Sequence, residues 1–248
     1  MKDIRAKILQ NKKVCGDYYK MALDAPYIAK NAKPGQFVQV RCSDGTEPLL
    51  RRPFSVHKVK GKTVEILYEI IGQGTEILSE RNTGETLDVL GPLGNGFTLS
   101  NMPAVIIAGG IGVAPLVFLA EELAKKKIKA IVLIGAKTKN MILCEKDFKN
   151  TGAEVKIATD DGSKGCKGFV SNLFEKAVGK IVYACGPAQM LKCVADMCKK
   201  KKMHCEISLE EKMACGIGAC LGCAVKVKGG GYKLACKDGP VFNIAELI

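Results

Sequence analysis

Residues 104–115 read AVIIAGGIGVAP. The run Ala104–Ala108 is unbroken and apolar, which is typical of a strand that is buried on both faces of a sheet. A glycine-rich turn follows it, and an amphipathic stretch, Pro115–Lys127, follows the turn. Glycines at such a turn let the backbone approach a pyrophosphate, and the N-terminus of the next helix attracts its charge. A tight connection without a ligand has the same composition, so the turn alone leaves both interpretations open.

The chain after this turn alternates between short apolar runs and amphipathic runs, which predicts a parallel sheet with helices on both faces. Strands are expected at Ala130–Gly135, Glu154–Thr159, Lys180–Ala184 and His204–Leu209, and helices near Glu145–Asn150, Gly168–Ala177 and Ala188–Lys202. A second motif, Cys185-Gly186-Pro187, follows a later strand of this sheet, at the edge where the carboxyl ends of parallel strands meet. Its position favours a nucleotide site shared with the glycine turn.

Residues 1–100 contain short β-rich runs separated by Gly, Pro and Asn, and this spacing predicts a small antiparallel barrel or sandwich. The expected strands are Ala6–Gln10, Gln36–Arg41, Ser55–Val59, Thr63–Tyr68 and Glu85–Leu90, with one helix at Gly74–Glu80. From Glu210 the composition shifts towards Cys and Gly, with hairpin-like runs at Ala224–Lys228 and Tyr232–Ala235. We therefore expect three domains: a β-barrel over 1–100, a nucleotide-type α/β domain over 101–209 and a small Cys/Gly-rich domain over 210–248.

Four cysteines near the C-terminus, Cys215, Cys220, Cys223 and Cys236, have the spacing C-x4-C-x2-C-x12-C. This is the plant-type [2Fe–2S] arrangement. The glycines between them suit a loop that folds closely around a cluster and adopts positive φ. The alternative is a structural zinc site, but such sites usually contain two C-x2-C pairs and this segment has one. We therefore expect a [2Fe–2S] cluster.

Two carboxylates, Asp160 and Asp161, follow the strand that is expected to end at Thr159. A carboxylate in this position can accept hydrogen bonds from ribose hydroxyls and would repel a 2′-phosphate, so we expect NAD rather than NADP. Lys164 and Lys167 lie close by in the sequence and weaken this preference. The alternative is an Asp-Gly turn with solvated acids.

Two motifs in the predicted barrel offer groups that bind phosphate. Arg51-Arg52-Pro53-Phe54-Ser55 is expected to precede a strand, and Gly72-Gln73-Gly74-Thr75 is expected to precede a short helix. Taken alone, the first is a basic turn and the second is a helix cap. An arginine and a helix N-terminus are also two effective ways to hold a pyrophosphate.

Together these motifs resemble the ferredoxin–NADP reductase superfamily and, within it, the family of electron-transfer subunits of dihydroorotate dehydrogenase B. The resemblance covers essentially the whole chain, including Gly91-Pro92-Leu93-Gly94, and its most specific parts are the segments Glu210–Cys220 and Cys236–Phe242. It implies that FAD is bound by Arg52, Pro53, Phe54, Ser55, Leu67, Tyr68, Glu69, Gly74 and Thr75. The expected NAD(H) site comprises Gly109, Gly110, Gly112, Ala114, Pro115, Asp160, Asp161, Cys185, Gly186 and Pro187. The resemblance places Cys185 beside the nicotinamide, where hydride transfer requires no nucleophile.

The resemblance further implies an oxidoreductase subunit in pyrimidine biosynthesis. Such a subunit carries electrons between NAD(H) and an FMN-containing catalytic dihydroorotate dehydrogenase subunit, through FAD and the cluster. Flavin exchanges both hydride and single electrons, so this relay is chemically coherent. The family usually forms a heterotetramer of two catalytic and two electron-transfer subunits. Two alternatives stay open: an NAD(P)H-dependent reductase subunit that serves ferredoxin or a sulfur compound, and a non-enzymatic iron–sulfur regulatory module.

The composition favours a cytoplasmic globular protein. With 47% hydrophobic and 25% charged residues, the chain shows no bias towards disorder and no apolar run long enough to cross a membrane. The N-terminus lacks the apolar region of a signal peptide. The net charge of +13 includes lysine runs at expected helix ends, Lys125–Lys127 and Lys199–Lys202, and no reader motif accompanies them, so we expect no nucleic-acid partner. The scattered cysteines are expected to be small buried hydrophobes: Cys15, Cys42, Cys144 and Cys166.

Overall fold

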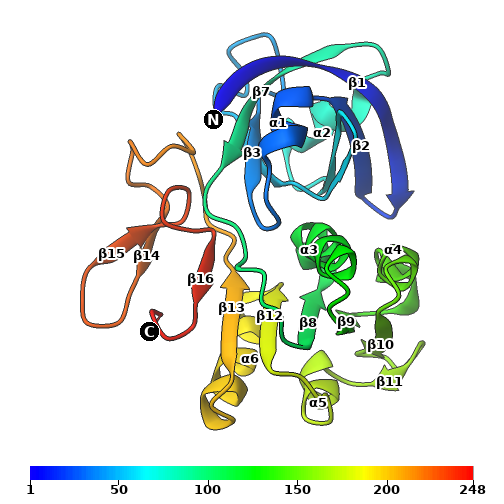
Figure 1. Ribbon diagram of the computed structural model, residues 1–248. Coiled ribbons are helices and arrows are strands. Elements are labelled where there is room, and N and C mark those ends of the chain that lie inside the picture. Colours follow the sequence, from blue (N-terminus) through cyan, green and yellow to red (C-terminus); the bar gives the residue numbers. More distant parts are fainter. Residues whose placement is uncertain (248) are drawn as a thin grey trace. The chain divides into compact units, whose positions relative to one another are not determined.

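The computed structural model describes residues 1–247, and the chain divides into two compact units (Figure 1). The first unit comprises Met1–Gly96 and Glu210–Pro240. The second comprises Phe97–Leu209 and the chain from Val241 onward. The chain therefore leaves the second unit at Leu209 and re-enters it at Val241. The division into three domains, 1–100, 101–209 and 210–248, stays a prediction, which the two compact units do not decide.

The first unit is built on antiparallel strands. They are β1 (Lys2–Cys15), β2 (Tyr18–Asp24), β3 (Phe37–Val40), β4 (Arg52–Ser55), β5 (Lys58–Lys60), β6 (Thr63–Glu69) and β7 (Thr86–Leu93). They form one seven-stranded sheet in the order β4-β3-β7-β1-β2-β6-β5. Two short helices accompany the sheet, α1 (Pro26–Asn31) and α2 (Gln73–Glu80).

Two local predictions for this sheet were wrong. Ser55–Val59 was expected to form one strand, but β4 ends at Ser55 and β5 begins at Lys58. The motif Arg52–Ser55 was expected to lie before a strand and is itself the strand β4. Proline is tolerated here because β4 lies at the edge of the sheet, where one side of the strand needs no ladder hydrogen bonds.

The cysteine-rich segment of the first unit has little regular structure. Its hairpin pairs β14 (Ala224–Lys226) with β15 (Tyr232–Leu234), and both strands are shorter than predicted. Asn95, just after β7, anchors the end of the segment, because its amide donates to the carbonyl oxygens of Lys237 (3.2 Å) and Asp238 (3.0 Å).

The second unit contains a seven-stranded sheet that is mostly parallel. Its strands are β8 (Ala104–Gly109), β9 (Ala130–Ala136), β10 (Glu154–Thr159), β11 (Cys166–Lys167), β12 (Ile181–Cys185), β13 (His204–Ser208) and β16 (Val241–Asn243). The order is β11-β10-β9-β8-β12-β13-β16, and only β16 pairs antiparallel to its neighbour. The order reverses between β8 and β12, so their carboxyl ends form the topological switch point at which such sheets bind ligands.

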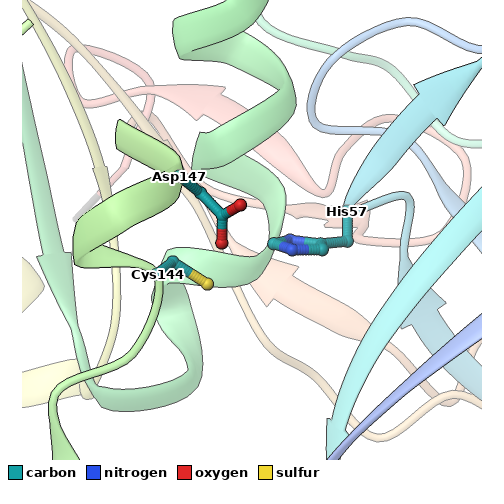
Figure 2. Close-up of side chains that lie close together, drawn as sticks. All are labelled: His57, Cys144 and Asp147. Carbon is teal, nitrogen blue, oxygen red and sulfur yellow. The ribbon is translucent and has the colours of Figure 1, made fainter. Parts of the chain in front are cut away.

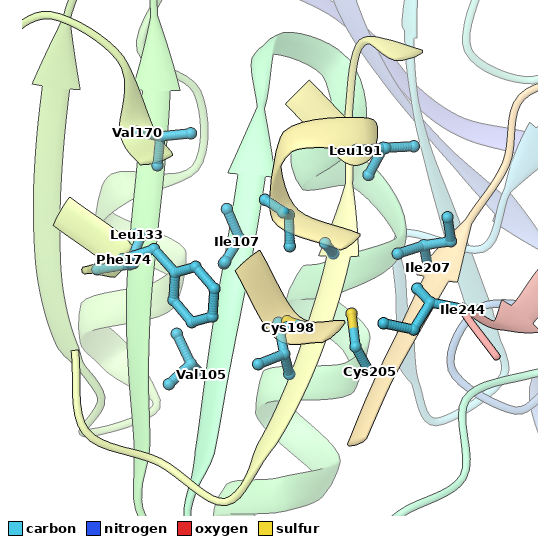
Figure 3. Packing of buried hydrophobic residues seen from close by; sticks show 13 residues of the cluster. Val105, Ile107, Leu133, Val170, Phe174, Leu191, Cys198, Cys205, Ile207 and Ile244 are labelled. Atoms are coloured by element: carbon cyan, nitrogen blue, oxygen red, sulfur yellow. The ribbon is translucent and has the colours of Figure 1, made fainter. Parts of the chain in front are cut away.

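Helices cover both faces of this sheet, as the alternating pattern predicted. They are α3 (Val113–Lys125), α4 (Glu145–Asn150), α5 (Val170–Phe174) and α6 (Ala188–Lys200), and a 3-10 turn, η1 (Gly110–Gly112), joins β8 to α3. Figure 1 shows α3 and α4 on one face and α5 and α6 on the other. Beneath α5 and α6 lies a core that includes Val105, Leu133 and Phe174 (Figure 3). Ile244 packs into the same core and ties the C-terminal end of the chain to this unit.

The lysine runs end helices as expected, since α3 ends at Lys125 and α6 at Lys200. Among residues 1–247, no helix is both long and apolar enough to cross a membrane.

Candidate metal centre and nucleotide sites

The four cysteines of the C-terminal motif converge in the first unit. The thiols of Cys215 and Cys220 form a hydrogen-bonded pair, and those of Cys223 and Cys236 form another. Cys223 and Cys236 are 2% and 3% exposed, whereas Cys220 is exposed. The sulfurs are therefore grouped two and two across a loop and the end of a hairpin.

This grouping fits two metal ions better than one. A tetrahedral zinc site has metal–sulfur distances of about 2.3 Å, which holds its sulfurs about 3.8 Å apart. Within residues 1–247, no three of these four sulfurs lie within 4.8 Å of one another. A [2Fe–2S] cluster takes two cysteine sulfurs on each iron. The residues present therefore fit a [2Fe–2S] cluster.

Backbone N–H groups of the cysteine loop point at the sulfurs. Cys215 Sγ accepts from the nitrogens of Ile217 (3.5 Å), Ala219 (3.3 Å) and Cys220 (3.4 Å). Burial alone would raise the pKa of the Cys215 thiol, but these donors outweigh it and lower the pKa to about 6. The loop thus stabilises a thiolate, the form that binds metal.

The opposite pair of cysteines lies in a different environment. Gly218 donates to Cys236 Sγ (3.1 Å), and the nitrogen of Cys236 donates to Cys223 Sγ (3.4 Å). Burial, followed by the hydrogen bond with Cys223, raises the pKa of Cys236 to about 12. Bound iron would supply the positive charge that this buried pair lacks.

In the second unit, the two predicted nucleotide motifs meet at the switch point. A Cβ on Gly112 would lie 2.3 Å from the carbonyl oxygen of Cys185 and 2.6 Å from the nitrogen of Gly186. Only glycine allows this approach. The N–H groups of η1 and of the first turn of α3 therefore lie beside the turn after β12, as a pyrophosphate site requires.

The side chains of this site are packed rather than exposed. Ala114, Pro115 and Cys185 are buried, so the first two contribute backbone and the Cys185 thiol is 1% exposed. This burial agrees with a packing or positioning role for Cys185 and not with a nucleophile. Met190 belongs to no motif and was not predicted, yet its sulfur lies 2.6 Å from the Cβ position of Gly109. This contact forms because α6, which contains Met190, packs against the glycine turn. No local sequence motif predicts that packing.

The two aspartates lie at the carboxyl end of β10, two strands away from β8. Asp161 Oδ1 accepts from the nitrogen (2.9 Å) and the hydroxyl (2.6 Å) of Ser163, and these bonds lower its pKa. Asp161 therefore closes a turn, as the alternative interpretation proposed. Lys164 forms an ion pair with Glu145, so its charge is partly neutralised by a residue other than the two aspartates. Asp160 is exposed and is the better candidate for a ribose contact.

In the first unit, Arg52 lies against the N-terminus of α2. Its Nη1 donates to the carbonyl oxygen of Leu50 (2.7 Å), and its Nε lies 3.0 Å from the Cβ position of Gly74. The Thr75 hydroxyl accepts from the nitrogens of Ile71 (2.9 Å) and Gly72 (3.3 Å), so it holds the turn in shape. A guanidinium beside a helix N-terminus fits the pyrophosphate of FAD.

The other predicted FAD residues lie on the neighbouring strands. Phe54 packs against Tyr68 with ring centroids 5.6 Å apart, and the Tyr68 hydroxyl donates to Asn11 Oδ1 (3.0 Å). Leu67 is buried on β6, whereas Ser55 and Glu69 are half-buried at the ends of β4 and β6. Glu69 is hydrogen-bonded to Tyr18, and the pKa of Tyr18 is raised to about 12 by burial and by this carboxylate. The contacts of these residues with FAD stay predictions.

The scattered cysteines only partly match their predicted burial. Cys42 is buried, Cys15 and Cys144 are half-buried, and the prediction was wrong for Cys166, which is exposed. Cys166 lies on the two-residue edge strand β11, and both residues of this strand are exposed. Figure 2 shows Cys144 at the start of α4, with Asp147 on the same helix.

The chain matches two family models. One is the iron–sulfur cluster binding domain of dihydroorotate dehydrogenase B, over residues 210–248. The other is the oxidoreductase NAD-binding domain, over residues 106–196. These matches coincide with the cysteine loop and with the parallel sheet.

Similarity to individual proteins extends over the whole chain. It is 47% identical to the dihydroorotate dehydrogenase B (NAD(+)) electron transfer subunit of Desulforamulus reducens, over 98% of this chain and 97% of the relative. The same subunit of Caldanaerobacter subterraneus subsp. tengcongensis is 42% identical, over 99% and 98%. A solved NADH-dependent reduced ferredoxin-NADP oxidoreductase superposes with a TM-score of 0.89 and 30% identity, over 98% of this chain and 89% of that one. The predicted fold class, an antiparallel flavin-type sheet followed by a parallel nicotinamide-type sheet and a C-terminal iron–sulfur segment, is confirmed.

Proposed function

Because the chain belongs to the family of dihydroorotate dehydrogenase B electron-transfer subunits, we propose that it passes electrons between NAD(H) and an FMN-containing catalytic subunit. That subunit would oxidise dihydroorotate to orotate in pyrimidine biosynthesis. The observation that carries the proposal is the grouping of four cysteines, two and two, in the same unit as the Arg52–α2 phosphate site. Bound FAD exchanges a hydride on one side and single electrons on the other, which a nicotinamide and a [2Fe–2S] cluster respectively require.

Each unit contributes a separate part of this task. The glycine turn and the Cys185-Gly186-Pro187 turn bind and orient the dinucleotide with backbone groups. Arg52 and the N-terminus of α2 hold the FAD pyrophosphate. The cysteine loop holds the cluster, and its N–H donors stabilise the thiolates. We further propose a heterotetramer of two such chains with two catalytic subunits. We also propose a reducing compartment such as the cytoplasm, because there a cluster of cysteines binds metal rather than forming disulfides.

The test is electron delivery by purified protein. We expect the chain to co-purify with FAD, iron and acid-labile sulfide, and NADH to bleach the flavin. With its catalytic subunit, the complex should form orotate from dihydroorotate with NAD as the acceptor. The variant Cys223→Ser should keep NADH-dependent reduction of a dye that takes electrons from FAD, but lose transfer to the catalytic subunit. Full transfer in a variant that lacks the cluster would contradict the proposed path.

A second candidate is a reductase subunit for ferredoxin, because the solved oxidoreductase resembles this chain over nearly its whole length. Its sequence identity to this chain, 30%, is lower than the 47% of the electron transfer subunit of Desulforamulus reducens. Purified chain mixed with ferredoxin and NADH distinguishes the two, since rapid ferredoxin reduction without a catalytic subunit would favour the second candidate.

A further inference from the structure

Gln39 is a buried amide without a partner. It lies within β3, opposite Pro53 of β4 and Leu90 of β7. Its exposed fraction is 0%, and neither Nε2 nor Oε1 has a hydrogen-bond partner among residues 1–247. An unpaired amide in a protein interior is unfavourable, so the presence of one indicates a partner that the polypeptide does not supply.

The cysteine loop covers this amide. A Cβ on Gly216 would lie 2.6 Å from Cγ of Gln39, 2.7 Å from Nε2 and 3.0 Å from Cδ. Gly216 is buried and has a φ of +72°, so both its backbone conformation and the adjacent amide require glycine. The residue before it is Cys215, which places the amide nitrogen next to the backbone that carries the first cysteine of the motif.

The sulfurs in this loop already accept hydrogen bonds from N–H groups, three of them at Cys215 Sγ. The Gln39 amide offers N–H groups of the same kind from β3, beside Gly216. A sulfur-rich centre bound at Cys215 would supply the acceptor that the amide lacks, because thiolate and sulfide accept hydrogen bonds in iron–sulfur sites.

We propose that Gln39 is a positioning residue of the iron–sulfur centre, whose Nε2 donates a hydrogen bond to sulfur at the Cys215 end of the bound cluster. This inference rests on the proposed function of the four cysteines. A donor to sulfur stabilises the more negative, reduced cluster and so raises its reduction potential. Gln39 thereby tunes how readily the cluster accepts an electron from the flavin bound in the same unit.

The test compares Gln39→Met with Gln36→Met in purified chain loaded with FAD and cluster. Methionine preserves length and flexibility but removes the amide. Gln36 is the matched control, because its amide is already paired: Nε2 donates to the carbonyl oxygen of Gly94 (2.7 Å) and Oε1 accepts from the nitrogen of Lys33 (2.8 Å). In a redox titration followed by EPR, Gln39→Met should shift the cluster midpoint potential to more negative values. Gln36→Met should lose stability and leave the potential unchanged.

If the Gln39→Met variant binds the cluster and its midpoint potential and g-values are unchanged, the inference is overturned. The hydrogen-bond partner of the Gln39 amide would then be a buried water molecule. If that variant does not retain the cluster, a measurement on the unmodified chain still tests the inference. With glutamine labelled at the side-chain nitrogen with ¹⁵N, pulsed EPR of the reduced cluster should show a ¹⁵N coupling that is absent without the label. Its absence would overturn the inference. Absence of iron and sulfide from the unmodified chain would instead overturn the proposed function.

Discussion

The variant Gly112→Ala tests the nucleotide site through the contact between its two turns. A Cβ on Gly112 would lie 2.3 Å from the carbonyl oxygen of Cys185, 2.5 Å from its carbonyl carbon and 2.6 Å from the nitrogen of Gly186. All of these are backbone atoms, and Cys185 is 1% exposed at the end of a central strand. A change of rotamer cannot relieve the overlap, so one of the two turns must move.

The size of the effect follows from these distances. Carbon and oxygen atoms that are not bonded rarely approach closer than about 3.3 Å, so a contact of 2.3 Å requires a displacement of roughly 1 Å. Overpacking of this kind lowers the free energy of unfolding by about 1–3 kcal/mol. A misplacement of about 1 Å in a positioning element reduces a rate by about 10²-fold. For NADH we therefore expect kcat/KM to fall by about 10²-fold, or about 2.7 kcal/mol of transition-state stabilisation.

The assay is stopped-flow reduction of the bound flavin by NADH, with FAD and iron contents measured on the same sample. Both contents should be unchanged, since their predicted sites lie in the first unit. The matched control is Gly45→Ala, because Gly45, like Gly112, lies outside the positive-φ region but has no heavy atom within 4 Å of its Cβ position. This control adds the same methyl group without steric overlap, and its kcat/KM should stay near that of the unmodified chain. A Gly112→Ala protein that reduces its flavin at the unmodified rate would refute the proposed site.

Three further changes test the other sites. Cys223→Ser should abolish or strongly weaken cluster binding because a thiolate ligand is lost, and stoichiometric iron and acid-labile sulfide in this variant would contradict the assignment. Arg52→Ala should weaken FAD binding by about 10- to 10²-fold, since a charge-assisted contact contributes about 1.5–3 kcal/mol; unchanged FAD content after dialysis would argue against the phosphate role. The unmodified chain should prefer NADH to NADPH by more than about tenfold in kcat/KM. Asp160→Ser should narrow that gap, whereas equal use of both nucleotides by the unmodified chain would refute the ribose contact.

The parallel sheet was the most predictable part of the fold. Glu145–Asn150 and Glu154–Thr159 form α4 and β10 with the bounds expected. Strands buried on both faces are continuous apolar runs, and the six residues of β8 are all buried, so local sequence carries the whole signal.

The antiparallel sheet was less predictable because its strands are only partly apolar. Tyr18–Asp24 forms β2, although Lys20 interrupts the apolar residues of this segment. Apolar and polar residues do not alternate regularly along it, so its sequence does not indicate a strand. Arg52–Ser55 contains a proline, which argues against a strand unless the strand is known to lie at an edge. Edge position is a property of the assembled sheet, so sequence alone could not provide it.

The same distinction separates the site residues that were predicted from those that were missed. The cysteine spacing is local and specific, and the structure brings the four thiols together. Gln39 and Met190 have no such motif. Gln39 matters only because Gly216 covers it, and Met190 only because it packs against Gly109. Both contacts join segments that are distant in sequence.

The cysteine segment combines a strong functional motif with weak structural propensity, and one physical cause explains both. Glu210–Pro240 has only a short hairpin and few buried apolar side chains, so it has no hydrophobic core of its own. Segments below about 40 residues usually need metals or cross-links to hold a structure. Here the chain fixes both ends of the segment, since β13 precedes it and β16 follows it in one sheet. With its ends fixed, the segment loses less conformational entropy when four cysteines close around a cluster. The interactions that form this functional site are therefore also the ones that fold it.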